Sequence, residues 1–507
     1  MTLLQAFASV SGMTFLSRLF GLARDVTLAA VFGATVSADA FFAAFRLPNT
    51  LRRFTAEGAL TQAFAPAYAQ AQKESDRQAA KLAGETAAGL GLLLLFISVL
   101  CVIAAPWIIA VIAPGLPDKP LASDLLRIVF PYILFISLVA LAAGMLNTQG
   151  RFRAAAAAPI LLNISIITAS LWVAPHFTRP VFALAWAVFI GGALQLLWIL
   201  CHLHRAGLWP DIRLCLSPSP AARRMLCLMA QSALAAGATQ INLLINLAIA
   251  SFLAAGSISW LHYADRLMEL PAGLLGAALA TVALPALAKS APDKQSDIID
   301  GALRLALFLA APAAVGLALF ADPLVEVLFK RGAFDNDDAQ MTSRAVIAYS
   351  AGTIGLVTTR PLVAFYFSRR DAATPVKTAL LALLATQMMN GIFIFGLELA
   401  HVGLALSVGL AACLNALTLL VILRRRDWYR PRLGWAAFIL RVLAALVALA
   451  VFLLFATPSA EFWQSATLGV KIGALLAYVF AAAAIYFSAA YLLGLRSDNF
   501  RTKIFSD

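Results

Sequence analysis

Charged residues are scarce in this chain, and no stretch is polar and long enough to form a soluble domain. Asp, Glu, Lys and Arg make up only 12% of the 507 residues, whereas a soluble domain carries about 25%. Hydrophobic residues make up 62%, and the mean hydropathy is +0.87. This composition excludes a disordered chain and a soluble multidomain enzyme, and it predicts an all-α protein that crosses a membrane many times.

The residue patterns that usually carry catalysis are missing as well. The five cysteines are dispersed, without the spacing of a metal site or a disulfide framework. The chain has no phosphate-binding loop of the GxxxxGK[ST] type, no set of metal ligands and no catalytic triad. We therefore expect no enzymatic activity, no metal and no cofactor, and only coupling to a monovalent cation stays open.

Fourteen apolar segments are long enough to cross a bilayer, which takes about 20 residues per helix. With fourteen spans, the loops on one side hold 22 lysines and arginines, and those on the other hold only Lys119, Arg179, Lys330 and Arg331. The positive-inside rule makes the basic side and both termini cytoplasmic, so the net charge of +13 reflects topology and not nucleic-acid binding. The predicted helices are 3–32, 37–68, 82–112, 122–147, 155–174, 180–203, 226–254, 259–288, 297–320, 341–367, 374–397, 401–423, 434–456 and 467–494.

An internal repeat divides most of these helices into two matched halves. Residues 45–66 resemble residues 265–285, and residues 149–159 resemble residues 368–375, at offsets near 219 and 217. Six helices per half make the repeats parallel, as in transporters with two matched lobes. The predicted organisation is an N-lobe (1–204), an amphipathic cytoplasmic linker (205–225), a C-lobe (226–425) and two further helices (426–507).

Arginine is concentrated in the first two predicted helices, where charge is costly. One arginine inside a bilayer costs about 2.5–3.5 kcal/mol, so these side chains must pair with acids or line a hydrated cavity. Pairing explains neutrality but not why so many charges lie in the membrane, whereas a cavity that binds an anion explains both. The pairing alternative joins Arg18 with Asp25, Arg46 or Arg53 with Asp39, and Arg52 with Glu57.

Arginine suits a phosphate ligand because its planar fork donates two hydrogen bonds at once. Asn49 and Arg52 are three residues apart and therefore face together on a helix. The candidate substrate-binding residues are Arg18, Arg24, Asn49, Arg52, Arg53 and Arg266. The candidate charge partners or gating residues are Asp25, Asp39, Glu57, Asp265 and Glu269.

A family resemblance rests on three segments, SRLFGLARD, ADAFFAAFRLPNTLRRFTAEGALTQAFAPAYA and LHYADRLMELPAGLLGAALATVALPALA. They resemble the MurJ (MviN-type) family of lipid II flippases in the multidrug/oligosaccharidyl-lipid/polysaccharide exporter superfamily. The resemblance covers essentially the whole chain, and its specific part is the arginine-bearing hairpin. It implies that the chain moves lipid II, an undecaprenyl-diphosphate-linked peptidoglycan precursor, from the cytoplasmic to the periplasmic leaflet of the inner membrane. The implied route is alternating access through a central arginine-lined cavity.

The resemblance also implies roles for individual residues. The family's essential positions match Arg18, Arg24, Asp39, Arg52 and Arg266. Helices 434–456 and 467–494 correspond to the pair that forms a groove for the polyprenyl tail. Some members bind sodium through acidic ligands, but the seventh helix here offers only Asn242 and Asn246. The implied partners are lipid II or another polyprenyl diphosphate glycolipid, membrane lipids and cell-wall synthesis proteins.

Three other functions stay open at this point. A flippase for another lipid-linked oligosaccharide, of the O-antigen or capsule type, would share the architecture and differ in the headgroup. A cation-coupled multidrug exporter would need an acidic, aromatic cavity, which the arginines disfavour. A non-transporting scaffold for cell-wall synthesis would tolerate replacement of the arginines by alanine.

Overall fold

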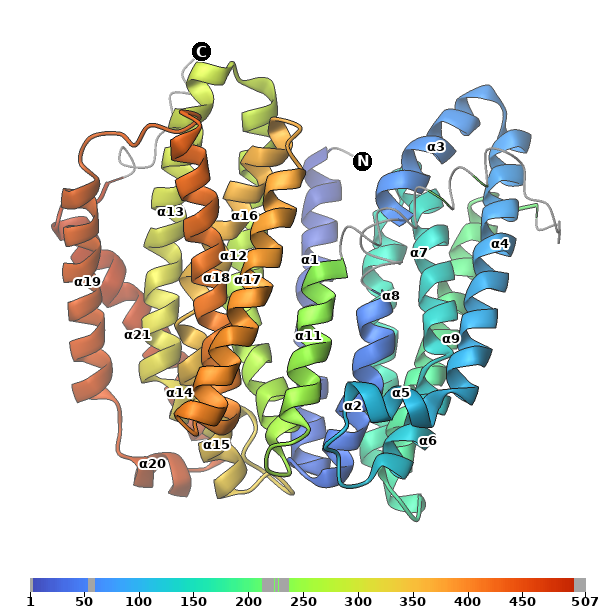
Figure 1. Ribbon diagram of the computed structural model, residues 1–507, viewed down its shortest axis with the longest axis horizontal. Coiled ribbons are helices and arrows are strands. Elements are labelled where there is room, and N and C mark those ends of the chain that lie inside the picture. The colour runs from blue at the N-terminus through green and yellow to red at the C-terminus, as the bar shows by residue number, and fades with distance from the viewer. Residues whose placement is uncertain (1–2, 53–59, 212–222, 224–226, 228–236, 497–507) are drawn as a thin grey trace. The chain divides into compact units, whose positions relative to one another are not determined.

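The computed structural model describes residues 3–52, 60–211, 223, 227 and 237–496. All regular elements within these ranges are helices (Figure 1), which confirms the all-α prediction. In the described part of the chain, ten helices are long and apolar enough to cross a membrane, and one bent pair raises the number to eleven.

Three predicted spans fall outside this set. They overlap α1 (Leu3–Phe32), α2 (Val36–Arg52) with α3 (Leu60–Glu74), and α11 (Gly237–Ala250). These segments are helical where they are described, but the total of fourteen spans stays a prediction.

The contacts divide the chain into two compact units, Met1–Ser259 and Trp260–Asp507. Within the first unit α9 packs closely on α7 and α8, because glycines replace side chains at the crossing. A Cβ on Gly192 would lie 2.6 Å from the ring of Tyr132. The helices of this unit, besides α1, α2, α3 and α11, are α4 (Asp76–Ile103), α5 (Ala105–Ile112), α6 (Lys119–Val129), α7 (Tyr132–Thr148), α8 (Phe152–Thr168) with a π turn (Ala169–Val173) and a 3₁₀ turn (Ala174–His176), and α9 (Val181–Arg205).

The second unit begins inside α12 (Ser257–Lys289), whose first three residues belong to the first unit. Apolar side chains of α13, α14, α19 and α21 share one core, in which the hydroxyl of Tyr486 donates to the carbonyl of Phe308 at 2.9 Å. The other helices are α13 (Pro292–Leu319), α14 (Ala321–Leu328), α15 (Asn336–Ser350), α16 (Thr353–Ser368), α17 (Ala373–Asn390) with a π turn (Gly391–Gly396), α18 (Ala400–Arg425), α19 (Trp435–Ala456), α20 (Ala460–Ser465) and α21 (Leu468–Leu492).

Several elements of the first unit recur in the second at a nearly constant offset, as a repeat would require. Helices α4 and α13 are both 28 residues long, and α13 starts 216 positions after α4. The short helices α5 and α14 have the same offset, and α8 and α17 both run into a π turn. Helices α19 and α21 follow the repeated elements and have no counterpart, as the sequence predicts. The lobe and linker boundaries stay predictions, and most of the linker lies outside the described residues.

Three predicted single helices each consist of two. Segment 82–112 breaks at Ala104, and Pro106 follows in the first turn of α5. Segment 122–147 breaks just before α7, where Pro131 is the N-cap. Each break thus has a proline, which lacks the backbone N–H that would continue the helix. Segment 341–367 bends by 42° between α15 and α16. At that bend Gly352 meets Gly409 so closely that a Cβ on Gly352 would lie 2.4 Å from the Cα of its neighbour.

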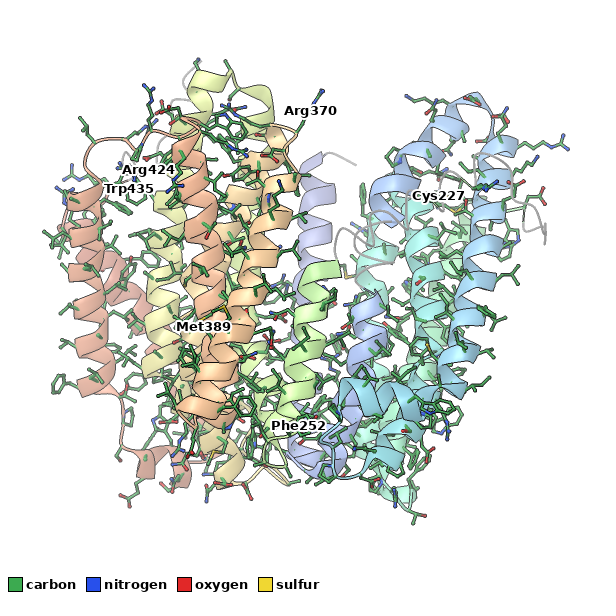
Figure 2. The ribbon with its side chains drawn as sticks, viewed as in Figure 1. Cys227, Phe252, Arg370, Met389, Arg424 and Trp435 are labelled. Carbon is green, nitrogen blue, oxygen red and sulfur yellow. The ribbon has the colours of Figure 1, made fainter. Side chains whose placement is uncertain are left out.

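A buried carboxylate fixes the start of α19 to α13. The side chain of Asp300 is fully buried and accepts hydrogen bonds from the hydroxyl of Tyr429 and the indole N–H of Trp435, both at 2.7 Å. It also forms an ion pair with Arg304 at 2.9 Å, and that guanidinium lies over the ring of Trp435. Trp435 marks the first turn of α19 (Figure 2). The first of the two added helices is therefore held by a specific polar network as well as by apolar packing.

A second carboxylate orders the turn between α16 and α17. Asp371 accepts hydrogen bonds from the backbone N–H and the hydroxyl of Thr374, and it pairs with Arg426 at 2.6 Å. Burial alone would raise the pKa of Asp371, but these hydrogen bonds and the arginine outweigh burial and lower the pKa to about 2. The carboxylate is therefore charged at any physiological pH.

Candidate functional site

Arg24 is held by three side-chain hydrogen bonds. It lies on α1, and its Nε and Nη2 donate to Oδ1 of Asp25 at 2.9 and 2.7 Å. Its Nη1 donates to Oδ1 of Asn163 on α8 at 3.1 Å. Only 13% of the arginine side chain and 2% of Asp25 are exposed. A guanidinium has five N–H donors, so Nη1 and Nη2 each keep one N–H beyond these three bonds.

Arg52 is oriented by its own helix, α2. Its Nε donates to Oδ1 of Asn49 at 3.2 Å, which confirms that these two residues share a face. Both side chains are half-buried. The amide oxygen of Asn49 therefore holds the Nε edge of the guanidinium.

Asp39 does more than the sequence indicated. It is 4% exposed on α2, and its two oxygens accept three hydrogen bonds from the first turn of α12 and the residue before it. The donors are the N–H of Gly256 at 2.7 Å, and the N–H and hydroxyl of Ser259 at 2.8 and 2.6 Å. A carboxylate at a helix N-terminus compensates both the free N–H groups and the helix dipole. Asp39 is thus a cap for α12, whatever charge partners it has besides.

Arg266 lies on α12 in the second unit. Its Nη1 donates to Oε2 of Glu269, three residues later, at 2.7 Å. The arginine side chain is 27% exposed and that of Glu269 is 41% exposed. The neighbouring Asp265 is half-buried on the same helix. Two of the predicted charge partners therefore lie beside the predicted arginine, and the ion pair is formed with Glu269.

The remaining candidates are placed less completely. Arg18 is exposed on α1, and Asp25 forms an ion pair with Arg24. Arg53 and Glu57 lie outside the described residues. Asn242 and Asn246 are half-buried on α11.

Sequence reasoning missed three partners of the site. Asn163 holds Arg24 from 139 positions away, and Gly256 and Ser259 bind Asp39 from 217 and 220 positions away. Asn163 is an amide in an apolar run, a signal that a search for isolated polar residues would find. The glycine and serine stand where a helix begins, which marks a capping site without revealing the carboxylate that uses it.

The protein has the features of a membrane transporter built from two units. These features are the repeated helices, the spans apolar enough for a bilayer and the arginines on α1, α2 and α12. The family model described as "Lipid II flippase MurJ" matches residues 28–473. The chain is 40% identical to "Lipid II flippase MurJ" of Burkholderia cenocepacia over 99% of this chain and 100% of the relative. It therefore belongs to the MurJ family.

Solved structures agree with this assignment. A structure described as "Lipid II flippase MurJ, inward closed conformation" superimposes with a TM-score of 0.80 at 26% identity, covering 97% of this chain and 99% of that chain. An inward-facing multidrug resistance MATE transporter of the MOP superfamily has a TM-score of 0.68 at 16% identity, covering 83% and 97% of the two chains. The second likeness concerns the fold alone.

Proposed function

We propose that this chain moves lipid II from the cytoplasmic to the periplasmic leaflet of the bacterial inner membrane. Its family membership and its apolar helices support transport of an amphiphile. The observation that carries the proposal is the arrangement around Arg24. A guanidinium held by Asp25 and Asn163 keeps one N–H on each terminal nitrogen, and two parallel N–H donors match the oxygens of a phosphate.

The neighbouring acids and amides set how the diphosphate is bound and released. Asp25 offsets the charge of Arg24 within the first unit, and Glu269 offsets the charge of Arg266 within the second. An arriving diphosphate first binds the N–H groups of Arg24 that Asp25 and Asn163 leave unused, and it then competes with Asp25 and Glu269 for the others. When the phosphate leaves, a carboxylate takes its place on the guanidinium. The buried arginine therefore stays paired in both states, and binding and release are both reversible.

The movement itself is proposed to be alternating access of the two repeated lobes around an arginine-lined cavity. Arg18, Arg24, Asn49, Arg52, Arg53 and Arg266 would contact the headgroup, and Asp25, Asp39, Glu57, Asp265 and Glu269 would act as partners or gates. Helices α19 and α21 would hold the polyprenyl tail, and both termini would be cytoplasmic. No chemical step on the substrate is needed for this transfer.

The test is complementation of a flippase-depletion strain by this chain and its variants. We expect wild type to restore growth and periplasmic exposure of lipid II, and Arg24→Ala, Arg52→Ala and Arg266→Ala to fail at normal membrane levels. Arg24→Lys keeps the charge but loses the fork, so it should also transport at least tenfold more slowly. Arg127→Ala is the matched control, since Arg127 is nearly half exposed and paired with Asp124.

The other outcomes would identify a different function. A well-expressed wild type that exposes no lipid II would point to another lipid-linked oligosaccharide. Full rescue by the three alanine variants would make the arginines structural and favour a scaffold.

A further inference from the structure

Three charged side chains form a largely buried cluster between α14 and α21. Glu326 accepts a hydrogen-bonded ion pair from Nζ of Lys330 at 2.8 Å and another from Nζ of Lys471 at 3.1 Å. The exposed fractions of Glu326, Lys330 and Lys471 are 12%, 18% and 14%. Two ammonium groups share one carboxylate, so one positive charge is left uncompensated in a place with little water.

In the part of the chain that the structure describes, Glu326 is the acid that pairs with these two lysines. Arg331 follows directly and donates through Nη2 to the carbonyls that end α14, which adds a further positive charge. Asp335 caps α15, and Asp338 accepts a hydrogen bond from the indole of Trp260 at 2.9 Å. Asp335 and Asp338 are therefore committed to other partners, and Asp322 lies exposed at the other end of α14.

The internal repeat shows that the fold of α14 does not require these charges. Its counterpart α5 lies 216 positions earlier and has the same length of eight residues. There the positions equivalent to the glutamate, the lysine and the following arginine are Ala110, Pro114 and Gly115. The cluster is thus particular to the second copy, where α14 contacts the added helix α21.

A link between the two helices does not explain the second lysine. Glu326 and Lys471 alone would form a neutral pair across α14 and α21. Lys330 is four residues from Glu326 on the same segment, so its charge adds nothing to that link. The ammonium group of Lys330 donates one of its three N–H groups to Glu326, and the other two can donate to an anion.

The surroundings of the cluster indicate an amphiphilic ligand. Leu468, Val470 and Ile472 flank the lysine of α21 and are exposed, as are Leu454 and Phe455 at the end of α19. We propose that Lys330 and Lys471 bind the phosphate of an anionic membrane lipid at the end of the second unit where α14 and α20 lie. Lys330 and Arg331 are two of the four basic loop residues on the basic-poor side predicted from the sequence. The site does not depend on what the transporter carries.

The experiment is native mass spectrometry of the full-length protein titrated with dioleoyl phosphatidylglycerol, with phosphatidylcholine and inorganic phosphate as separate arms. We expect wild type to bind phosphatidylglycerol at least tenfold more tightly than phosphatidylcholine, and Lys330→Gln to lose most of that preference. Glu326→Gln leaves both ammonium groups and removes their shared carboxylate, so it should keep or increase the preference.

Two controls separate this site from others. Lys119→Gln removes an exposed basic residue predicted on the same side, and Arg24→Ala alters the candidate transport site; both should keep the preference. The proposal is wrong if wild type binds the two lipids equally, or if Lys330→Gln keeps the preference. If inorganic phosphate binds as tightly as phosphatidylglycerol, the ligand is not a lipid. If Lys330→Gln does not fold, wild type can be labelled with a photoreactive phosphatidylglycerol instead. The proposal requires the label on α14 or α21, and labelling elsewhere would contradict it.

Discussion

The cap that Asp39 provides for α12 leads to a quantitative prediction. Its carboxylate is buried and accepts three short hydrogen bonds from Gly256 and Ser259. Asp39→Ala removes all three acceptor contacts and leaves two backbone N–H groups without a partner at a helix start. The first turn of α12 should therefore open more often in the variant.

The size of the effect follows from the number and charge of the bonds. A hydrogen bond to a charged group is worth about 1.5–3 kcal/mol, and an ordinary N-cap about 1 kcal/mol. Three bonds to one carboxylate are not additive, so we expect a loss of about 3 kcal/mol. That loss corresponds to roughly 150-fold faster local opening. Asp39→Asn keeps one oxygen acceptor but points its amide N–H groups toward other donors. Its local opening should therefore be faster than that of wild type and slower than that of Asp39→Ala.

Hydrogen–deuterium exchange of the peptide around residues 252–262 measures this opening; Phe252 in the loop before α12 marks its start (Figure 2). Asp118→Ala is the matched control, because Asp118 caps α6 through one bond, to the N–H of Leu121 at 2.9 Å, and is 34% exposed. In Asp118→Ala the first turn of α6 should exchange only a few-fold faster than it does in wild type. If the α12 peptide of Asp39→Ala exchanges no faster than it does in wild type, the capping argument is wrong.

Three further predictions concern the second unit. Tyr429→Phe removes a hydroxyl donor from the buried carboxylate of Asp300 and should cost about 1.5–3 kcal/mol in thermal unfolding followed by tryptophan fluorescence. Gly352→Ala forces a methyl group against Gly409 and should cost about 1–3 kcal/mol in the same assay. Asp371 has a folded pKa of about 2, below its ordinary value, so it stabilises the protein above about pH 4 and loses this effect as the pH falls toward 2. The melting temperature of wild type should accordingly exceed that of Asp371→Asn at pH 5 and approach it near pH 2.

Each of these predictions has a control in the chain. Tyr478→Phe removes a hydroxyl that donates to the carbonyl of Ala456 at an exposed position, and it should cost less than about 1 kcal/mol. Gly316→Ala places a methyl group where nothing lies within 4 Å and should stabilise α13 by up to about 1 kcal/mol. Asp427→Asn alters an exposed ion pair and should show no such pH dependence. Equal losses in a variant and its control would contradict the stated cause.

The sequence predicted the features that depend on hydrophobicity and local spacing. The apolar runs located the helices, the offset near 219 predicted the repeat, and the three-residue spacing placed Asn49 beside Arg52. These features follow from periodicity along one helix, which a sequence displays directly. Pro106 and Pro131 mark the two helix breaks in the sequence, but the apolar runs continue across them and hide the breaks from a hydropathy pattern.

The features that were missed depend on distant pairs. Nothing near Asp39 indicates that its oxygens meet a helix start some 217 positions later. The ion pair of Arg24 with Asp25 was missed for a different reason. Adjacent residues on a helix do not face each other, but the long arginine side chain folds back onto its neighbour while Asn163 holds its far end. Side-chain reach and tertiary contact decided these cases.

The two π turns have a consequence for how these spans should be read. A π turn closes i→i+5 hydrogen bonds and so takes up an extra residue without ending the helix. Beyond Thr168 and Asn390 the side chains are therefore rotated relative to a stripe drawn with one 3.6-residue period from the start of α8 or α17. Both copies carry this π turn at the end of corresponding helices, so the same correction to the helical period applies to the last turns of both spans.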